Sequence, residues 1–267
     1  MTPVSINNFF NDKNPWTLRL LGHVPFQKNR GIEQVENEYN LDKYAKLLAF
    51  DFKTVEEYKA KEFELGGMNP ITGEMHISCG EEIFKTSVKV AREKYYELIL
   101  STLKKYPSKN YCELGCGYGY NLHLIGSNAY GGEYSINAVN LGKKIGLPVT
   151  EFNYYNEKDY DFITPDTTIF TAHSIEQIPD ATIIINNLEK QKSKINYVVH
   201  FEPTVIKERT SLLGLMRNKY MELNDYNRNL LTILQERNDI EILELNKDIF
   251  GLVPLNTTNL IVWKFKK

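Results

Sequence analysis

A glycine-rich turn is the first group of residues in this chain that could do chemistry. A short apolar run at 111–114 leads directly into glycines at alternate positions, Gly115, Gly117 and Gly119. Such glycines permit positive φ angles and let a ligand approach the backbone closely. The dinucleotide-binding fingerprint needs its third glycine one place later, where this chain has Tyr120. The spacing therefore predicts a ligand-binding loop and disfavours NAD as its ligand.

A carboxylate lies farther along the chain at a spacing typical of nucleoside binding. Glu133 comes 18 positions after Gly115, directly after the apolar run 129–132. A carboxylate in this place can accept both hydroxyl hydrogens of a ribose, as an acidic residue about 20 positions downstream does in dinucleotide folds. We therefore expect Glu133 to contact an adenosine ribose; the alternative is a glutamate that is merely exposed on the surface.

Polar residues follow five apolar runs at the point where each run ends. In open parallel sheets, ligands bind outside the carboxyl ends of the strands, so these side chains should meet along one edge. The pattern predicts a polar crevice there. Its expected residues are Glu113, Glu133, Asn153, His173, and His200 with Glu202.

The glycine turn resembles the E-x-G-x-G-x-G motif of class I S-adenosylmethionine-dependent methyltransferases, with Glu113 and the three glycines at the family's positions. The resemblance implies that S-adenosylmethionine is the cofactor and S-adenosylhomocysteine its product. It also implies that Glu113 holds the methionine amino group, that the loop backbone wraps the cofactor, and that Asn153 or Tyr154 contacts the adenine. The residues assigned to the cofactor are Glu113, Gly115, Gly117, Tyr118, Gly119, Asn121, Glu133, Asn153, Tyr154 and His173.

His173 and Glu176 follow the fourth apolar run, where the family resemblance places the meeting of cofactor and acceptor. Methyl transfer from a sulfonium is an in-line displacement, so the enzyme must align donor and acceptor and give the proton of a hydroxyl acceptor somewhere to go. A histidine with an ordinary pKa near 6.5 can accept a proton at neutral pH. We predict that both residues are catalytic; the alternative is that His173 packs beside the cofactor or bonds a loop carbonyl.

His200 and Glu202 end the fifth run and offer an alternative base or an acceptor-binding pair. Side chains two positions apart on a strand point to the same face of the sheet. We predict catalytic roles for these two residues as well. Arg209 and Arg217 come next, and they are expected either to bind an anionic acceptor, such as a phosphate or uronate, or to be solvated.

These residues need a sheet to position them, and apolar runs that alternate with helical or turn segments predict one from residue 108 onward. Helices are expected at 88–106, 136–144 and 219–236. The last two strands are expected to form an antiparallel edge pair. The predicted strands are 111–114, 129–132, 149–152, 168–172, 195–201, 240–245 and 260–265.

The predicted fold class is α/β, with a Rossmann-like, seven-stranded methyltransferase sheet that is mostly parallel and has an antiparallel last strand. This S-adenosylmethionine-binding domain is assigned to residues 108–267, and a helical N-terminal cap, which narrows the acceptor site, to residues 1–107. A chain of 267 residues is long enough for one such domain and a smaller appendage.

Composition limits the expected partners. A net charge of -2 and the lack of a basic, aromatic-interleaved tract argue against nucleic acid. No apolar run approaches the roughly 20 residues that span a bilayer, and the N-terminus has no signal-peptide pattern, so we expect a cytoplasmic protein without a membrane partner. The three cysteines (Cys79, Cys112 and Cys116) are too irregularly spaced for a disulfide framework, and no metal site is expected.

The expected function is O-methylation of a small-molecule or sugar acceptor. The runs 173–178 and 200–203 together resemble O-methyltransferases of bacterial sugar and surface-polysaccharide (capsule) pathways. Other acceptors stay open, namely a phosphoramidate or another group attached to a polysaccharide, and RNA or another macromolecule. A non-catalytic scaffold that binds S-adenosylmethionine is a further alternative.

Overall fold

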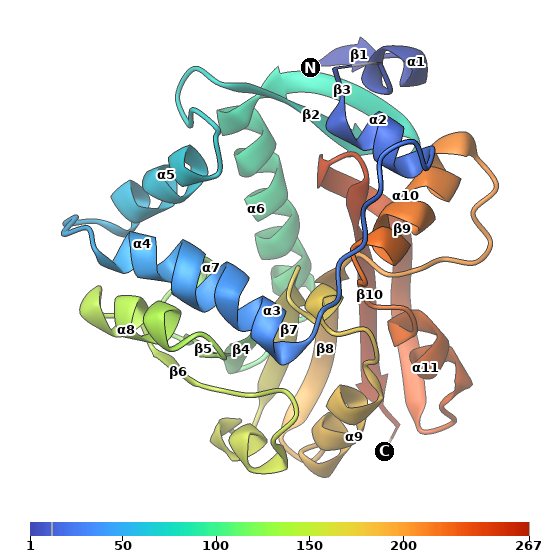
Figure 1. The fold of residues 1–267 in the computed structure, drawn as a ribbon. Coiled ribbons are helices and arrows are strands. Elements are labelled where there is room, and N and C mark those ends of the chain that lie inside the picture. Colours follow the sequence, from blue (N-terminus) through green and yellow to red (C-terminus); the bar gives the residue numbers. More distant parts are fainter. Residues whose placement is uncertain (12, 267) are drawn as a thin grey trace.

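A computed structural model, which describes residues 1–11 and 13–266, has one mixed sheet of ten strands at its centre (Figure 1). Along the sheet the strand order is β1-β3-β2-β9-β10-β8-β7-β4-β5-β6. The strands are β1 (Thr2–Val4), β2 (Glu74–Cys79), β3 (Glu82–Ser87), β4 (Asn110–Leu114), β5 (Ala129–Glu133), β6 (Val149–Glu151), β7 (Thr167–Ala172), β8 (Ile195–Glu202), β9 (Ile240–Val253) and β10 (Asn256–Phe265).

The prediction of a seven-stranded, mostly parallel sheet was wrong in its details. The seven expected strands correspond to β4 to β10, but β1, β2 and β3 extend the sheet. Within the described residues, the parallel pairs are β4 with β5, β4 with β7, β5 with β6 and β7 with β8; the other pairs are antiparallel. The strands β9 and β10 do pair antiparallel, but they lie inside the sheet, because β10 also pairs with β8 and β9 with β2.

The N-terminal region is only partly helical, which corrects the expectation of a helical cap. The strands β2 and β3 form a hairpin, and Ser78 of β2 pairs with Gly251 of β9. This hairpin was not predicted, although β2 alternates polar and apolar residues over six positions, as half-buried strands do. The helices of this region are α1 (Ile6–Phe9), α2 (Pro15–Leu20), α3 (Ile32–Val35), the π-helix η1 (Glu36–Tyr44), α4 (Ala45–Leu48) and α5 (Val55–Leu65).

Of the three predicted helices, two lie where they were expected and the third does not. Helices α6 (Val88–Lys105) and α8 (Ile136–Lys144) lie where they were expected, and each begins at a serine whose hydroxyl accepts a backbone N–H. The expected helix 219–236 is two helices, α10 (Leu212–Leu223) and α11 (Leu230–Glu236). The chain breaks between them at Asp225, whose φ of 54° is left-handed and cannot continue a helix. The others are α7 (Tyr120–Ile125), α9 (Thr182–Lys190) and the 3-10 helices η2 (Glu157–Phe162) and η3 (Ile175–Gln177).

Helices cover both faces of the central strands. On one face, apolar residues of α9 and α11 pack against β4, β7, β8 and β10. On the other face, α6, α7 and α8 pack against β7, β8 and β10. The N-terminal segment passes from α2, which lies beside α10, to η1 and α4, which lie beside α8 (Figure 1). Among the described helices, none is long and apolar enough to cross a membrane.

Candidate active site

The glycine loop between β4 and α7 depends on a backbone geometry that favours glycine. Gly115, Gly117 and Gly119 have φ angles of 76°, 57° and 93°, in the left-handed region that glycine occupies without steric cost. A Cβ on Gly115 would lie 2.4 Å from the Cβ of Ser174, and one on Gly117 would lie 2.5 Å from the hydroxyl of Tyr44. The loop therefore packs tightly against the segment after β7 and against the N-terminal region.

Glu113, the penultimate residue of strand β4, is almost fully buried. Its Oε1 accepts a hydrogen bond from Asn121 Nδ2 at 2.7 Å, whereas its Oε2 has no partner among the described residues. Burial raises the pKa of Glu113 to about 8. A buried acceptor without a partner marks a place where a ligand can donate a hydrogen bond.

Glu133, at the end of β5, holds the glycine loop from the other side. Its Oε2 accepts the backbone N–H of Gly117 and its Oε1 accepts that of Ser135, each at 2.8 Å. Burial raises the pKa of Glu133, and the backbone hydrogen bonds oppose this shift. Each carboxylate oxygen retains the capacity to accept one more donor.

These residues line a cavity of about 440 Å³ at the carboxyl ends of β4, β5 and β7. The structure brings most of the predicted site together here, as the strand-end argument requires. The predicted residues that line the cavity are Glu113, Gly115, Gly117, Tyr118, Asn121, Glu133, Asn153, Tyr154, His173 and Glu176. Gly119, His200 and Glu202 do not line it.

Asn153 and Tyr154 enter the cavity from the segment after β6. The hydroxyl of Tyr154 donates to the carbonyl oxygen of Leu114 at 2.6 Å and lies 2.7 Å from Ser174 Oγ. Asn153 Oδ1 accepts the backbone N–H of Tyr155 at 2.9 Å. Tyr154 thus braces the segments that follow β4 and β7, while adenine contact by either residue stays a prediction.

His173 follows β7 with a φ of 53°, which is uncommon for a residue other than glycine. Its Nδ1 lies 3.0 Å from Glu176 Oε2 and its Nε2 lies 2.9 Å from Thr258 Oγ1. Burial acts to lower the pKa of His173, but the charge and hydrogen bond of Glu176 outweigh burial and raise it. Glu176 therefore stabilises the imidazolium form of His173 relative to that of an exposed histidine.

Glu176 is the centre of a small polar cluster at this end of the cavity. Besides His173, it accepts from Gln177 Nε2 at 2.8 Å and from Asn256 Nδ2 at 3.1 Å. These bonds turn both amide oxygens away from the carboxylate, and Gln177 Oε1 and Asn256 Oδ1 are buried without a partner among the described residues. Both amides line the cavity. Gln177 and Asn256 were not predicted; Gln177 lies in the predicted site run, whereas no sequence signal marks Asn256.

Glu202 has a positioning role in place of the predicted catalytic one. Its Oε1 accepts the backbone N–H groups of Ser174 at 2.9 Å and Ile175 at 3.1 Å, and its Oε2 accepts that of Glu176 at 3.1 Å. Burial raises the pKa of Glu202 to about 7. The carboxylate fixes the start of η3, and so the position of Glu176.

The predicted catalytic role of His200 was wrong. The side chain is fully buried, its Nδ1 lies 3.0 Å from Thr171 Oγ1, and its ring lies beside that of Trp263. Burial lowers the pKa of His200 to about 3, so the ring is neutral near pH 7. The side chain points into the core between neighbouring strands, where an acceptor in the cavity cannot reach it.

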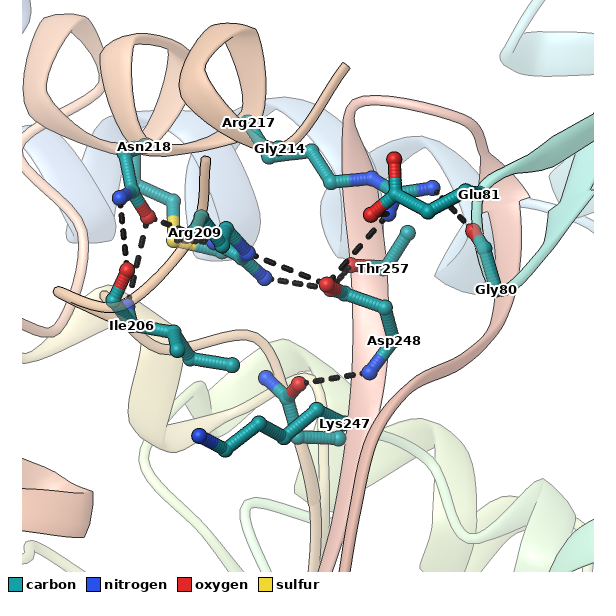
Figure 2. A network of polar contacts seen from close by, with 12 residues as sticks. Gly80, Glu81, Ile206, Arg209, Gly214, Arg217, Asn218, Lys247, Asp248 and Thr257 are labelled. Carbon is teal, nitrogen blue, oxygen red and sulfur yellow. Dashed lines mark hydrogen bonds and ion pairs between the residues drawn. The ribbon is translucent and has the colours of Figure 1, made fainter. Parts of the chain in front are cut away.

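Arg209 and Arg217 neither line the cavity nor lie in solvent, which corrects both expectations for them. Figure 2 shows that they converge on Asp248. Arg209 Nε donates to Asp248 Oδ2 at 3.1 Å, and Arg217 Nη1 lies 3.4 Å from the same oxygen. Arg217 also donates to the carbonyl oxygens of Gly80 at 2.8 Å and Pro254 at 3.0 Å. Both arginines therefore stabilise the packing of these segments against one another.

The N-terminal region supplies a wall of the cavity that sequence patterns do not mark. Asn40 of η1 is buried, and its Oδ1 accepts from Ser135 Oγ at 2.8 Å and from the backbone N–H of Asn137 at 2.9 Å. These contacts join residues about 95 positions apart, so only folding brings them together. The other residues of this wall include Arg30, Ile32, Val35, Glu36, Tyr39, Lys43, Tyr44, Lys59, Glu62 and Phe63.

No protein-family model matches the sequence, and no curated protein matches it. Among solved structures, magnesium protoporphyrin IX methyltransferase (ChlM) from Synechocystis, with bound SAH, aligns with a TM-score of 0.51 at 12% identity, over 88% of this chain and 100% of that chain. This likeness shows that the two chains share a fold.

Two further structures align less well. A SAM-dependent methyltransferase from Anabaena variabilis has a TM-score of 0.48 at 13% identity, over 66% of this chain and 86% of that one. The N-methyltransferase NodS from Bradyrhizobium japonicum has a TM-score of 0.46 at 11% identity, over 66% of this chain and 87% of that one.

Proposed function

We propose that this protein is an S-adenosylmethionine-dependent methyltransferase that methylates a hydroxyl group of a small molecule or sugar. The observation that carries the proposal is the meeting of the glycine loop, Glu113 and Glu133 in one cavity. Its location at the carboxyl ends of parallel strands β4, β5 and β7, in a methyltransferase fold, supports the same conclusion.

The residues of the cavity fit this cofactor. The unpartnered Oε2 of Glu113 is an acceptor for the methionine ammonium. The oxygens of Glu133, each with one backbone N–H bound, can still accept the two ribose hydroxyl hydrogens. The cavity volume of about 440 Å³ lies in the range of roughly 300–1,000 Å³ that is usual for small-molecule sites.

When bound, the cofactor supplies a methyl group on a positively charged sulfur. The task of the protein is then to align an acceptor and to remove its proton. In this proposal His173 accepts the proton of the acceptor hydroxyl. Glu176, whose Oε2 lies 3.0 Å from His173 Nδ1, stabilises the imidazolium that results. The acceptor hydroxyl must replace Thr258 as the partner of His173 Nε2, since that nitrogen is now bonded to the threonine hydroxyl.

A hydroxyl-rich acceptor suits the polar cluster around Glu176. Gln177 Oε1 and Asn256 Oδ1 are buried acceptors without partners among the described residues, and leaving such a group unpaired costs about 1–3 kcal/mol. Hydroxyl groups of a sugar would donate to them. The resemblance of runs 173–178 and 200–203 to O-methyltransferases of bacterial surface-polysaccharide pathways supports a sugar acceptor from capsule biosynthesis.

Calorimetric titration with S-adenosylmethionine, S-adenosylhomocysteine and NAD tests the cofactor assignment. We expect micromolar binding of the first two and its loss in Glu133→Ala, because the alanine removes the acceptor for the ribose and the bonds to Gly117 and Ser135. Glu151→Ala is the matched control, since Glu151 pairs with Glu133 in the sheet but is exposed. Binding of NAD alone would overturn the proposal.

A further inference from the structure

Two lysines of the N-terminal region meet one glutamate at the wall of the cavity. Lys43 Nζ lies 2.6 Å from Glu62 Oε1, and Lys59 Nζ lies 2.7 Å from Glu62 Oε2. All three residues line the cavity, and the side chains of Lys59 and Glu62 are each only 15% exposed. The single carboxylate thus holds two ammonium groups side by side.

This cluster has unused hydrogen-bonding capacity. Each ammonium carries three donors, and Glu62 accepts from each lysine through one oxygen. Aromatic rings occupy part of the space around them, with Lys59 Nζ 4.9 Å from the ring centre of Tyr120 and Lys43 Nζ 5.0 Å from that of Tyr44. The unused N–H donors of the two ammonium groups can therefore bind an anionic group that enters the cavity.

The cluster adjoins the glycine loop. The hydroxyl of Tyr118, between Gly117 and Gly119, donates to Glu62 Oε2 at 3.2 Å. Lys59 is close enough to Glu113 for its charge to oppose the rise in the pKa of that carboxyl. An acceptor without a partner, Glu113 Oε2, and two cationic donors therefore border the same part of the cavity.

We propose that Lys43 and Lys59, positioned by Glu62, bind the carboxylate of the amino-acid part of the cofactor, while Glu113 accepts from its amino group. An α-amino acid presents these two charged groups on one carbon, so its binding site needs donors and acceptors close together. The inference rests on the proposed function. It makes the N-terminal region part of the cofactor site and not only a cover for the acceptor.

Calorimetric titrations with two ligands test the inference. The first is S-adenosylhomocysteine, and the second is its analogue that lacks the α-carboxylate but keeps the amino group. We expect the wild type to bind the first ligand about tenfold or more tightly than the second. In Lys59→Met, and in Lys43→Met, this preference should shrink severalfold while binding of the carboxylate-free analogue persists, which also shows that the variant is folded.

Lys61→Met is the matched control. Lys61 lies on α5, the helix that carries Lys59, and it pairs with Glu64 at 3.1 Å. It does not line the cavity, so Lys61→Met should keep the full preference for the ligand with the carboxylate. A wild type that binds both ligands equally, or lysine variants that retain the preference, would overturn the inference and leave the cofactor assignment intact. Failure of the wild type to bind either ligand would instead overturn the proposed function, and the inference with it.

Discussion

The end of the cavity that we assign to the acceptor contains one carboxylate, Glu176, on which three side chains converge. His173, Gln177 and Asn256 each bond one of its oxygens. Glu202 holds the backbone of Glu176 in place through a hydrogen bond to its N–H. The charge of Glu176 therefore sets both the protonation of His173 and the direction in which the two amide oxygens point.

Glu176→Gln should lower the pKa of His173. The charge of Glu176 now outweighs burial and raises that pKa, so burial prevails once the charge is lost. NMR titration of the His173 ring would measure the shift. A base acts in its neutral form, so methyl transfer should rise with pH through the His173 pKa, and in the variant this rise should move to lower pH. Glu189→Gln, a change at a half-buried residue that does not line the cavity, is the control. An unchanged His173 titration in Glu176→Gln would refute the assigned coupling.

Among the helices, η1 has the most direct influence on the cavity. It is a π-helix of nine residues, a form that is rare and often found at functional sites. It ends at Lys43 and Tyr44, which line the cavity, and Tyr44 packs against Gly117 of the glycine loop. Its Asn40 is bonded to the first residues of α8. One element therefore joins the N-terminal region to the glycine loop and to α8.

Asn40→Ala should loosen η1 from α8. The change leaves Ser135 Oγ and the N–H of Asn137 without their acceptor, and the loss of such buried hydrogen bonds costs about 1–3 kcal/mol. Urea unfolding should show this decrease in stability, and hydrogen–deuterium exchange should become faster in residues 36–48. Gln34→Ala, at an exposed position of the neighbouring helix, should change neither. Unaltered exchange in Asn40→Ala would show that the hydrogen bonds of Asn40 do not hold residues 36–48 against α8.

At the scale of the whole molecule, the network in Figure 2 joins three parts of the chain that are far apart in sequence. Asp248 lies on β9, Arg209 and Arg217 come from the segment after β8 and from α10, and Gly80 from the β2–β3 hairpin. The network therefore helps to fix the N-terminal hairpin against the C-terminal strands. The network supports the junction between β2 and β9, which pair directly only at Ser78 and Gly251.

Asp248→Asn should destabilise the protein strongly. The change leaves two buried guanidinium groups without their shared counter-charge, and loss of one partner of a buried ion pair typically costs about 3–5 kcal/mol. Urea denaturation measures the free energy of unfolding directly. In Glu241→Gln, which breaks an exposed pair with Lys264, the loss should stay below about 1 kcal/mol. Equal effects in the two variants would contradict the importance of this network.

The sequence by itself determined the residues whose patterns are local. The strand–turn spacing of residues 111–119 and the following Glu133 predicted a ligand-binding loop, and the strand ends predicted where a cavity forms; the structure places the loop and Glu133 at that cavity. Helical periodicity likewise placed α6 and α8, because the apolar face of each is set by neighbouring positions along the chain.

Tertiary structure decided what depends on distant partners. His200 and His173 both follow apolar runs, yet one is enclosed in the core and the other reaches the cavity, since the neighbouring strands decide which side chains are covered. Tertiary contacts also decided three other features: the three N-terminal strands, the burial of Arg209 and Arg217, and the place of Lys43 and Lys59 at the cavity wall. Each results from contacts between segments far apart in the chain, and local propensity and spacing carry no information about such contacts.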